Sequence, residues 1–255
     1  MRIIVSIWKK NMKKYFRNKM ESVGSLIQPM MWLLLFSVGM SSFMTGPDGA
    51  FDYLTFVLPG MIGFTIVSAS INGGTSWIDE RMSGIVKTYQ AAPISRFAPL
   101  AANVMTVLSK VLIQCLVILA VGLLLGASLN VNLISILIAF LLVILFGIGF
   151  SGIALYFASK APNGGAYHMV IFMFQMPMLF FSNALYTTAQ LPLIFKVIAT
   201  LNPMTYLISG LRRLTATIPS HGVMDLIVQL AILSVFALFG MMIATNAYKG
   251  IIDHD

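Results

Sequence analysis

Residues 133–158 read LISILIAFLLVILFGIGFSGIALYFA and include no charged side chain. The hydrocarbon core of a bilayer is roughly 30 Å thick, and about 20 apolar residues cross it as a helix. Because lipid offers no partner for an open backbone, an apolar stretch of this length in a membrane must be helical. We therefore expect residues 133–158 to form a transmembrane helix.

Five further apolar stretches of similar length flank this one on both sides. The six predicted spans are Val23–Phe43, Leu54–Thr75, Val104–Leu125, Leu133–Ala158, Ala166–Thr188 and Leu226–Ala247. No span carries an aspartate or glutamate near its centre, although ion-coupled transporters use such carboxylates as relays. The sequence thus predicts an all-α membrane protein with six transmembrane helices. It also disfavours a transporter driven by a proton or sodium gradient.

The composition agrees with a membrane location. Hydrophobic residues make up 58% of the 255 residues and charged residues only 9%, whereas soluble domains carry about 25% charge. The first apolar run, of about 21 residues, exceeds the roughly 7–15 of a signal-sequence core, so we expect it to remain in the protein. Cys115 is the single cysteine, which allows neither a disulfide within the chain nor a cysteine-based metal site.

The net charge of +8 is explained by topology better than by nucleic-acid binding. Lysine and arginine are enriched in the cytoplasmic segments of membrane proteins. Seven of the 16 precede the first span, namely Arg2, Lys9, Lys10, Lys13, Lys14, Arg17 and Lys19. We therefore expect a multi-pass protein of the cell (plasma) membrane with a cytoplasmic N-terminus. After six spans, the C-terminus is expected in the cytoplasm as well.

The N-terminal segment has the pattern of an amphipathic helix. Apolar residues recur at helical spacing with lysines between them, at Ile4, Ile7, Trp8, Met12, Tyr15 and Phe16. Such a helix lies in the membrane interface. We expect residues 1–20 to form this interfacial helix and residues 21–255 to form one six-span membrane domain. The helix either anchors the topology alone or also braces the spans against a cytoplasmic partner.

Two segments between spans are long enough to hold structure of their own. In the cytoplasmic one, Asp79-Glu80-Arg81 is expected to end the second span, and a short helix is then expected to run to about Gln90. Pro93 ends that helix, because proline disfavours helix in the residue before it. On charge alone, an ordinary solvated turn explains this segment better than a docking element. The other segment, Ala189–Asp225, is external and precedes the last span.

Both segments resemble those of type-2 ABC exporter permeases. The cytoplasmic match runs from Asp79-Glu80-Arg81 through Gly84 to Ala92-Pro93-Ile94-Ser95. The external match comprises Leu191-Pro192, Leu201-Asn202-Pro203-Met204-Thr205-Tyr206 and Gly210-Leu211-Arg212. The order of elements agrees too, so the resemblance covers essentially the whole chain. It is closest to the branch that exports drugs, polysaccharides and lipo-oligosaccharides.

The resemblance implies that Ser83–Gln90 is a coupling helix seated in a cleft of a separate ATPase. The residues it implies for ATPase coupling are Asp79, Glu80, Arg81, Ser83, Gly84, Ile85, Lys87 and Thr88. It also implies that Leu191–Leu211 forms short external re-entrant helices. Their cap residues are Pro192, Asn202, Pro203, Tyr206 and Arg212. The sequence contains no Gly-x-x-x-x-Gly-Lys-Ser/Thr loop, so ATP and Mg are expected on the partner ATPase and no cofactor on this chain.

Spans one, two and five are the candidates for the substrate path. Flexible methionines suit an adaptable surface, and glutamines beside prolines need hydrogen-bond partners that lipid lacks. The candidate path residues are Gln28, Met31, Phe64, Met173, Gln175, Met176 and Phe180. Simple packing, or contact with lipid, explains each of them equally well. His168 and Lys110 lie near span ends, and each can extend its polar group to the interface.

These features predict the membrane subunit of an ATP-driven exporter, paired with itself or with a second permease. An amphipathic or lipid-like substrate fits, with multidrug-type efflux favoured and polysaccharide or lipo-oligosaccharide export as the alternative. An ATP-independent secondary transporter is the alternative of another class, against which the carboxylate-free spans stand. Neither a metal site nor an intramembrane enzyme is expected, because His168, His221 and His254 are scattered along the chain.

Overall fold

The computed structural model describes residues 2–41, 53–91, 95, 97–129, 132–186, 192–215 and 223–252, and every regular element in these ranges is a helix. The helices are α1 (Arg2–Arg17), α2 (Lys19–Ser41), α3 (Tyr53–Met82), α4 (Ile85–Ala91), α5 (Ala98–Leu124), α6 (Leu133–Lys160), α7 (Gly164–Phe180), α8 (Leu193–Leu201), α9 (Pro203–Thr215) and α10 (Val223–Ile252).

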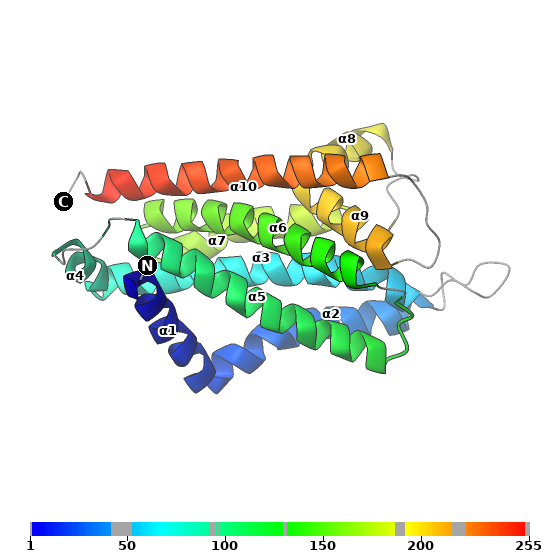
Figure 1. The fold of residues 1–255 in the computed structure, drawn as a ribbon, viewed down its shortest axis with the longest axis horizontal. Coiled ribbons are helices and arrows are strands. Elements are labelled where there is room, and N and C mark those ends of the chain that lie inside the picture. Colours follow the sequence, from blue (N-terminus) through cyan, green and yellow to red (C-terminus); the bar gives the residue numbers. More distant parts are fainter. Residues whose placement is uncertain are drawn as a thin grey trace.

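The long helices run side by side, and the two ends of the bundle differ (Figure 1). At one end lie α4, the start of α1 and the last turns of α10; we call this the α4 end. At the other lie α8 and the turns near it, which we call the α8 end. Helix α1 runs across the long helices near the α4 end and meets α2 at a sharp elbow.

Helix α3 forms the centre of the bundle, in contact with α2, α5, α6, α7 and α9. In its most apolar stretch, 83% of the residues are buried inside the protein. Glycines allow this close approach: a Cβ at Gly60 would lie 2.8 Å from the carbonyl oxygen of Ala184, and one at Gly74 would overlap the hydroxyl of Tyr167. That hydroxyl donates to the carbonyl oxygen of Ile71 at 3.0 Å, which fixes α7 on α3.

Four helices among the described residues are long and apolar enough to cross a membrane: Tyr53–Met82, Ala98–Leu124, Leu133–Lys160 and, within α10, Asp225–Ala247. Helices α8 and α9, bent by 82°, would add a fifth if they form one broken span. Of the other two predicted spans, the first corresponds to α2 and the fifth to α7. Helix α7 has 17 residues and ends at Phe180, short of the predicted Thr188. The count of six spans therefore stays a prediction.

The helix that contains the second predicted span runs past the predicted end of that span at Thr75. Asp79, Glu80 and Arg81 do not end it, because α3 continues through them to Met82. The backbone N–H of Ser83 still donates to the carbonyl oxygen of Asp79 at 3.0 Å, so helical bonding passes through the charged residues. Ser83 and Gly84 then form a turn, and α4 begins at Ile85, two residues later than the predicted helix.

The external segment predicted as re-entrant contains α8 and α9, separated at Asn202. Leu191, where that segment was expected to begin, lies outside the described residues. The bend follows from the sequence, because Pro203 starts α9 and lacks the N–H that a continuous helix would need there. The two helices therefore meet at nearly a right angle at the α8 end.

Candidate functional site

Helix α4 is a short element joined to the end of α3 by a glycine turn. Gly84 has a φ of +76°, a conformation that residues with a side chain rarely adopt. Val86 is 3% exposed and anchors the helix on the core, while Lys87 and Thr88 are exposed. Helix α4 therefore presents a free polar face at its end of the bundle, as a docking element requires.

Lys10 of α1 ties this short helix to the rest of the protein. Its Nζ lies 2.9 Å from Oε1 of Glu80 and donates to the hydroxyl of Tyr89 on α4 at 2.7 Å. Burial acts to lower the pKa of Lys10, but the hydrogen bonds to Tyr89 and Glu80 and the charge of Glu80 outweigh it. The pKa of Lys10 is therefore raised above its ordinary value. One cation thus joins α1, the end of α3 and α4.

Arg81 ties the same corner to the turn between α6 and α7. Its Nη1 donates to the carbonyl oxygen of Ser159 at 2.7 Å, and its Nη2 donates to the carbonyl oxygen of Ala161. Two backbone acceptors at the end of α6 therefore depend on one guanidinium. The Arg81 side chain therefore holds the end of α3, from which α4 extends, against the end of α6.

We expect Arg81→Gln to lower the free energy of unfolding by about 2 kcal/mol, because hydrogen bonds from a charged donor each contribute roughly 1.5–3 kcal/mol. Reversible denaturation of the purified chain in mixed detergent measures this change. Arg2→Gln is the matched control, since Arg2 is exposed and its side chain makes no described bond. Equal stabilities of the two variants would show that the hydrogen bonds of Arg81 do not stabilise the fold.

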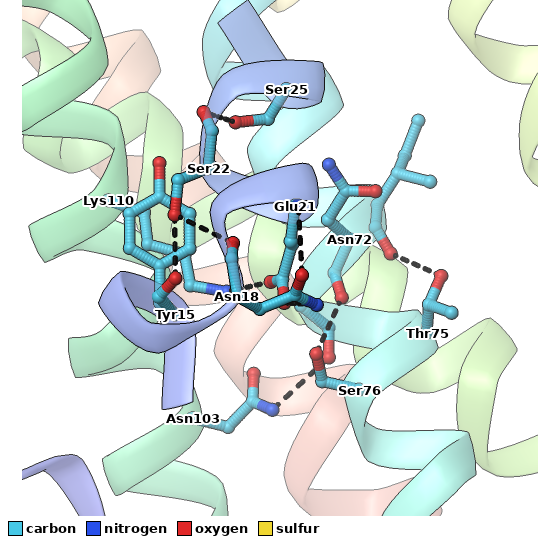
Figure 2. A network of polar contacts seen from close by, with 12 residues as sticks. Tyr15, Asn18, Glu21, Ser22, Ser25, Asn72, Thr75, Ser76, Asn103 and Lys110 are labelled. Carbon is cyan, nitrogen blue, oxygen red and sulfur yellow. Dashed lines mark hydrogen bonds and ion pairs between the residues drawn. The ribbon is translucent and has the colours of Figure 1, made fainter. Parts of the chain in front are cut away.

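A partly buried ion pair joins the α1–α2 elbow to α5 (Figure 2). Nζ of Lys110 lies 2.7 Å from Oε1 of Glu21, with side-chain exposures of 7% and 27%. The same ammonium lies 4.6 Å from the ring centroid of Tyr15. The sequence left Lys110 able to extend its charge to the membrane interface; in the structure this charge is paired with Glu21.

Neutral polar groups surround this pair and extend it to α3. Nε2 of Gln114 donates to the hydroxyls of Ser25, at 2.7 Å, and Tyr15, at 3.4 Å. Nδ2 of Asn103 donates to the carbonyl oxygen of Gly73 at 3.2 Å. Helix α5 thus carries three polar residues, one turn or two apart, toward α1, α2 and α3. Sequence reasoning did not single out Glu21, Asn103 or Gln114.

The structure separates the predicted path residues into exposed and buried sets. Gln28, Met31, Met173 and Phe180 are exposed, Met176 is half-buried, and Phe64 and Gln175 are buried. The Nε2 of Gln175 donates to the hydroxyl of Ser68 on α3 at 3.1 Å. Phe64 of α3 is 1% exposed and packs in the core of the bundle, so in this conformation it lies on no accessible surface.

An open, mostly apolar cleft of about 560 Å³ runs between α3 and α7. Met173 and Gln175 are the two predicted path residues that line it. His168 lies at the same cleft, where its Nε2 is 3.2 Å from the hydroxyl of Thr75. The cleft is therefore lined by thioethers, aromatic rings and a few polar groups.

Asn202 and Arg212, two of the predicted cap residues, are structural anchors of the α8 end. Nδ2 of Asn202 donates to the carbonyl oxygens of Met178, at 2.8 Å, and Phe181, at 3.1 Å, which holds the α8–α9 bend on the end of α7. Arg212 donates to the carbonyl oxygen of Phe56 at 3.0 Å and covers the Phe56 ring at 3.6 Å.

The remaining three cap residues shape the two short helices. Pro192 precedes α8 and Pro203 begins α9. The hydroxyl of Tyr206 donates to the carbonyl oxygen of Thr200 at 2.7 Å, across the bend. Asn202, Pro203 and Tyr206 thus lie at the bend, whereas Pro192 and Arg212 lie at the far ends of the two helices.

Residues 2–216 match the ABC-2 type transporter family, a match that takes in α1 through α9. The chain belongs to this family. The resemblance inferred from Asp79–Ser95 and Leu191–Arg212 is therefore confirmed. Membership implies an ABC ATPase subunit as a partner, and it identifies the chain as a multi-pass membrane permease.

Curated relatives carry permease names. The chain is 31% identical over 218 residues to a protein of Porphyra purpurea named as a transport permease, ycf38, covering 83% of this chain and 70% of the relative. It is 28% identical over 201 residues to the Cyanophora paradoxa protein of the same name, covering 77% and 68%. It is 25% identical over 249 residues to the daunorubicin resistance ABC transporter permease protein DrrB1 of Streptomyces coeruleorubidus, covering 95% and 86%.

Proposed function

We propose that this ABC-2 family member is the membrane-spanning permease subunit of an exporter powered by a separate ATPase. The α4 end faces the cytoplasm with both termini, and the α8 end faces outward across the plasma membrane. Helices α2, α3, α5, α6, α7 and α10 are the six spans. The chain itself binds no ATP, and ATP with Mg resides on the partner.

The position of α4 carries this proposal. A short exposed helix on a glycine turn can enter a cleft of a partner, while its buried Val86 and its Tyr89–Lys10 bond transmit force to the bundle. Lys87 and Thr88 form the face that meets the ATPase. Charged residues at the end of α3, Glu80 and Arg81, act behind this face through their bonds to α1 and α6.

Closure of two ATPase subunits would then push α4 and, with it, α1. Helix α1 is joined to α5 by the bond from Nε1 of Trp8 to the hydroxyl of Ser109, at 3.0 Å, and the elbow after α1 is joined by the Glu21–Lys110 pair. Rigid-body movement of packed helices is an established way to change access to a central path. The push therefore reaches the spans through the polar contacts of α5.

The path lies between two permease copies, or between this chain and a related one, with α2, α3 and α7 on either side. The exposed Met31 and Met173, and the cleft between α3 and α7, support this placement. Without a second copy, lipid would have to cover these thioethers and the exposed Phe180.

The substrate we favour is an amphipathic or lipid-like compound of the multidrug type. The methionine and aromatic side chains of the α3–α7 cleft adapt to varied apolar shapes, and one relative is named for daunorubicin resistance. ATP hydrolysis by the complex, measured across a panel of amphiphiles and lipid-linked saccharides, decides between this class and polysaccharide or lipo-oligosaccharide export.

Thr88→Trp tests the role of α4. We expect it to weaken association with the partner ATPase by roughly 30-fold, because blocking a central contact of an interface costs about 2 kcal/mol or more. Copurification from membranes, followed by titration of the ATPase onto the purified chain, measures the change. Thr200→Trp is the matched control, since Thr200 is exposed on α8 at the opposite end. An ATPase that binds the Thr88→Trp chain as well as the control would refute docking on α4.

A further inference from the structure

An open cleft of about 560 Å³ lies between α1 and the corner where α3 meets α4. Its two walls differ in charge. The α1 wall carries Lys10, Lys13, Lys14 and Arg17, and the opposite wall carries Asp79, Glu80, Ser83 and Ile85. Four cations thus face two carboxylates, so the cleft is positive overall.

The excess positive charge has no partner within the described residues. Lys10 is paired with Glu80 at 2.9 Å, and neither this ion pair nor the Lys110–Glu21 and Arg213–Asp225 pairs involve Lys13, Lys14 or Arg17. All three of these side chains are exposed. An anion from outside the chain is therefore the natural occupant.

Exposed apolar side chains occupy the α1–α2 elbow, next to Arg17 in the sequence. Phe16 is 60% exposed, Met20 is 89% exposed and Val23 is 58% exposed. The elbow projects from the side of the bundle (Figure 1). An occupant that meets the cations and these side chains together must have an anionic part and an apolar part.

We propose that this cleft binds the headgroup of an anionic phospholipid, with the acyl chains over Phe16, Met20 and Val23. Polybasic amphipathic helices attract anionic lipids, and each lysine or arginine near the surface strengthens binding by roughly fivefold. An acidic surface of a soluble protein fits less well, because it would leave the apolar elbow uncovered. Since Glu80 and Ser83 also line the cleft, the lipid sits against the corner that leads into α4.

The test uses the full-length chain purified in detergent and does not depend on the proposed export function. Phosphatidylglycerol and phosphatidylcholine are offered in equal amounts, and native mass spectrometry reports the lipid retained. The cleft variant is Lys13→Gln/Lys14→Gln/Arg17→Gln. Its matched control, Arg2→Gln/Lys9→Gln/Lys19→Gln, removes the same charge from exposed positions that do not line the cleft.

We expect the cleft variant to lose on the order of tenfold or more of its phosphatidylglycerol affinity, and the control to lose far less. Asp79→Asn should act in the opposite direction and increase phosphatidylglycerol retention, because it removes a cleft carboxylate that takes part in no ion pair among the described residues. That gain keeps the proposal testable should the triple variant fail to fold.

Three outcomes would overturn the proposal. Equal losses in the two triple variants would mean that the charge of α1 attracts lipid diffusely, without a site. Unchanged lipid retention with loss of ATPase association would assign the cleft to an acidic protein surface. Displacement of phosphatidylglycerol by glycerol 3-phosphate at matched concentration would assign it to a soluble phosphate.

Discussion

Lys110→Met should lower the free energy of unfolding by about 3 kcal/mol, the lower end of the cost of breaking a buried ion pair, because the Glu21 carboxylate left behind is partly exposed. Glu21 would lose the ammonium that now lies 2.7 Å from its carboxylate. The elbow between α1 and α2 would lose its charged contact with α5. Reversible denaturation of the purified chain in mixed detergent measures the loss.

A double variant separates the charge effect from the packing effect. Lys110→Met/Glu21→Gln should recover most of the lost stability, since replacing both members of a buried pair is often nearly neutral. Lys9→Met, at an exposed position of α1, should change the stability by less than about 0.5 kcal/mol. If Lys110→Met matches Lys9→Met, or if the double variant is no better than the single one, the pair contributes nothing.

Gly152→Ala should cost about 3 kcal/mol, because helices α6 and α10 touch backbone to backbone at this point. A Cβ at Gly152 would overlap the carbonyl group of Gly240, and one at Gly240 would overlap the carbonyl of Gly149. Backbone atoms cannot turn aside as a flexible side chain can, so the helices must separate, and overpacking of this kind costs 1–3 kcal/mol or more.

The control for this substitution is Gly164→Ala, because no atom lies within 4 Å of the position that its Cβ would take. Thermal unfolding in detergent should show a marked drop in Tm for Gly152→Ala and little change for Gly164→Ala. Equal Tm values would mean that α6 and α10 are packed more loosely than the structure has them.

Long apolar stretches allowed several helices to be predicted closely from the sequence. Helix α6 begins at the predicted Leu133, where the side chain of Asn132 caps it by accepting from the N–H of Ser135 at 2.8 Å. Its end at Lys160 lies two residues beyond the prediction. The period and length of an apolar run determine such a helix, whatever packs against it.

Boundaries set by local bonding were harder to predict. Charged residues suggested an end to the second span at Asp79, yet α3 continues to Met82. In the folded protein, the charge of Arg81 finds acceptors on Ser159 and Ala161. Those acceptors lie 78 and 80 residues away in the sequence, so no local pattern reveals them.

The polar network was not predictable for the same reason. Lys110 and Glu21 are 89 residues apart, and each in isolation looks like a charge at the edge of an apolar stretch. Only the elbow after α1 brings the carboxylate to α5. The resemblance to ABC exporter permeases located Asn202 and Arg212 as special positions, whereas their bonds to α7 and to Phe56 came from the structure.

Transport by reconstituted protein tests most directly whether this chain is a pathway driven by an outside ATPase. A fluorescent amphiphile is followed into proteoliposomes that contain the chain, its ATPase or both, with ATP and Mg outside and with or without a proton gradient. We expect ATP-dependent accumulation only with both proteins, and its loss in the Thr88→Trp variant. Accumulation by the chain alone under a proton gradient would contradict this account and identify a secondary transporter.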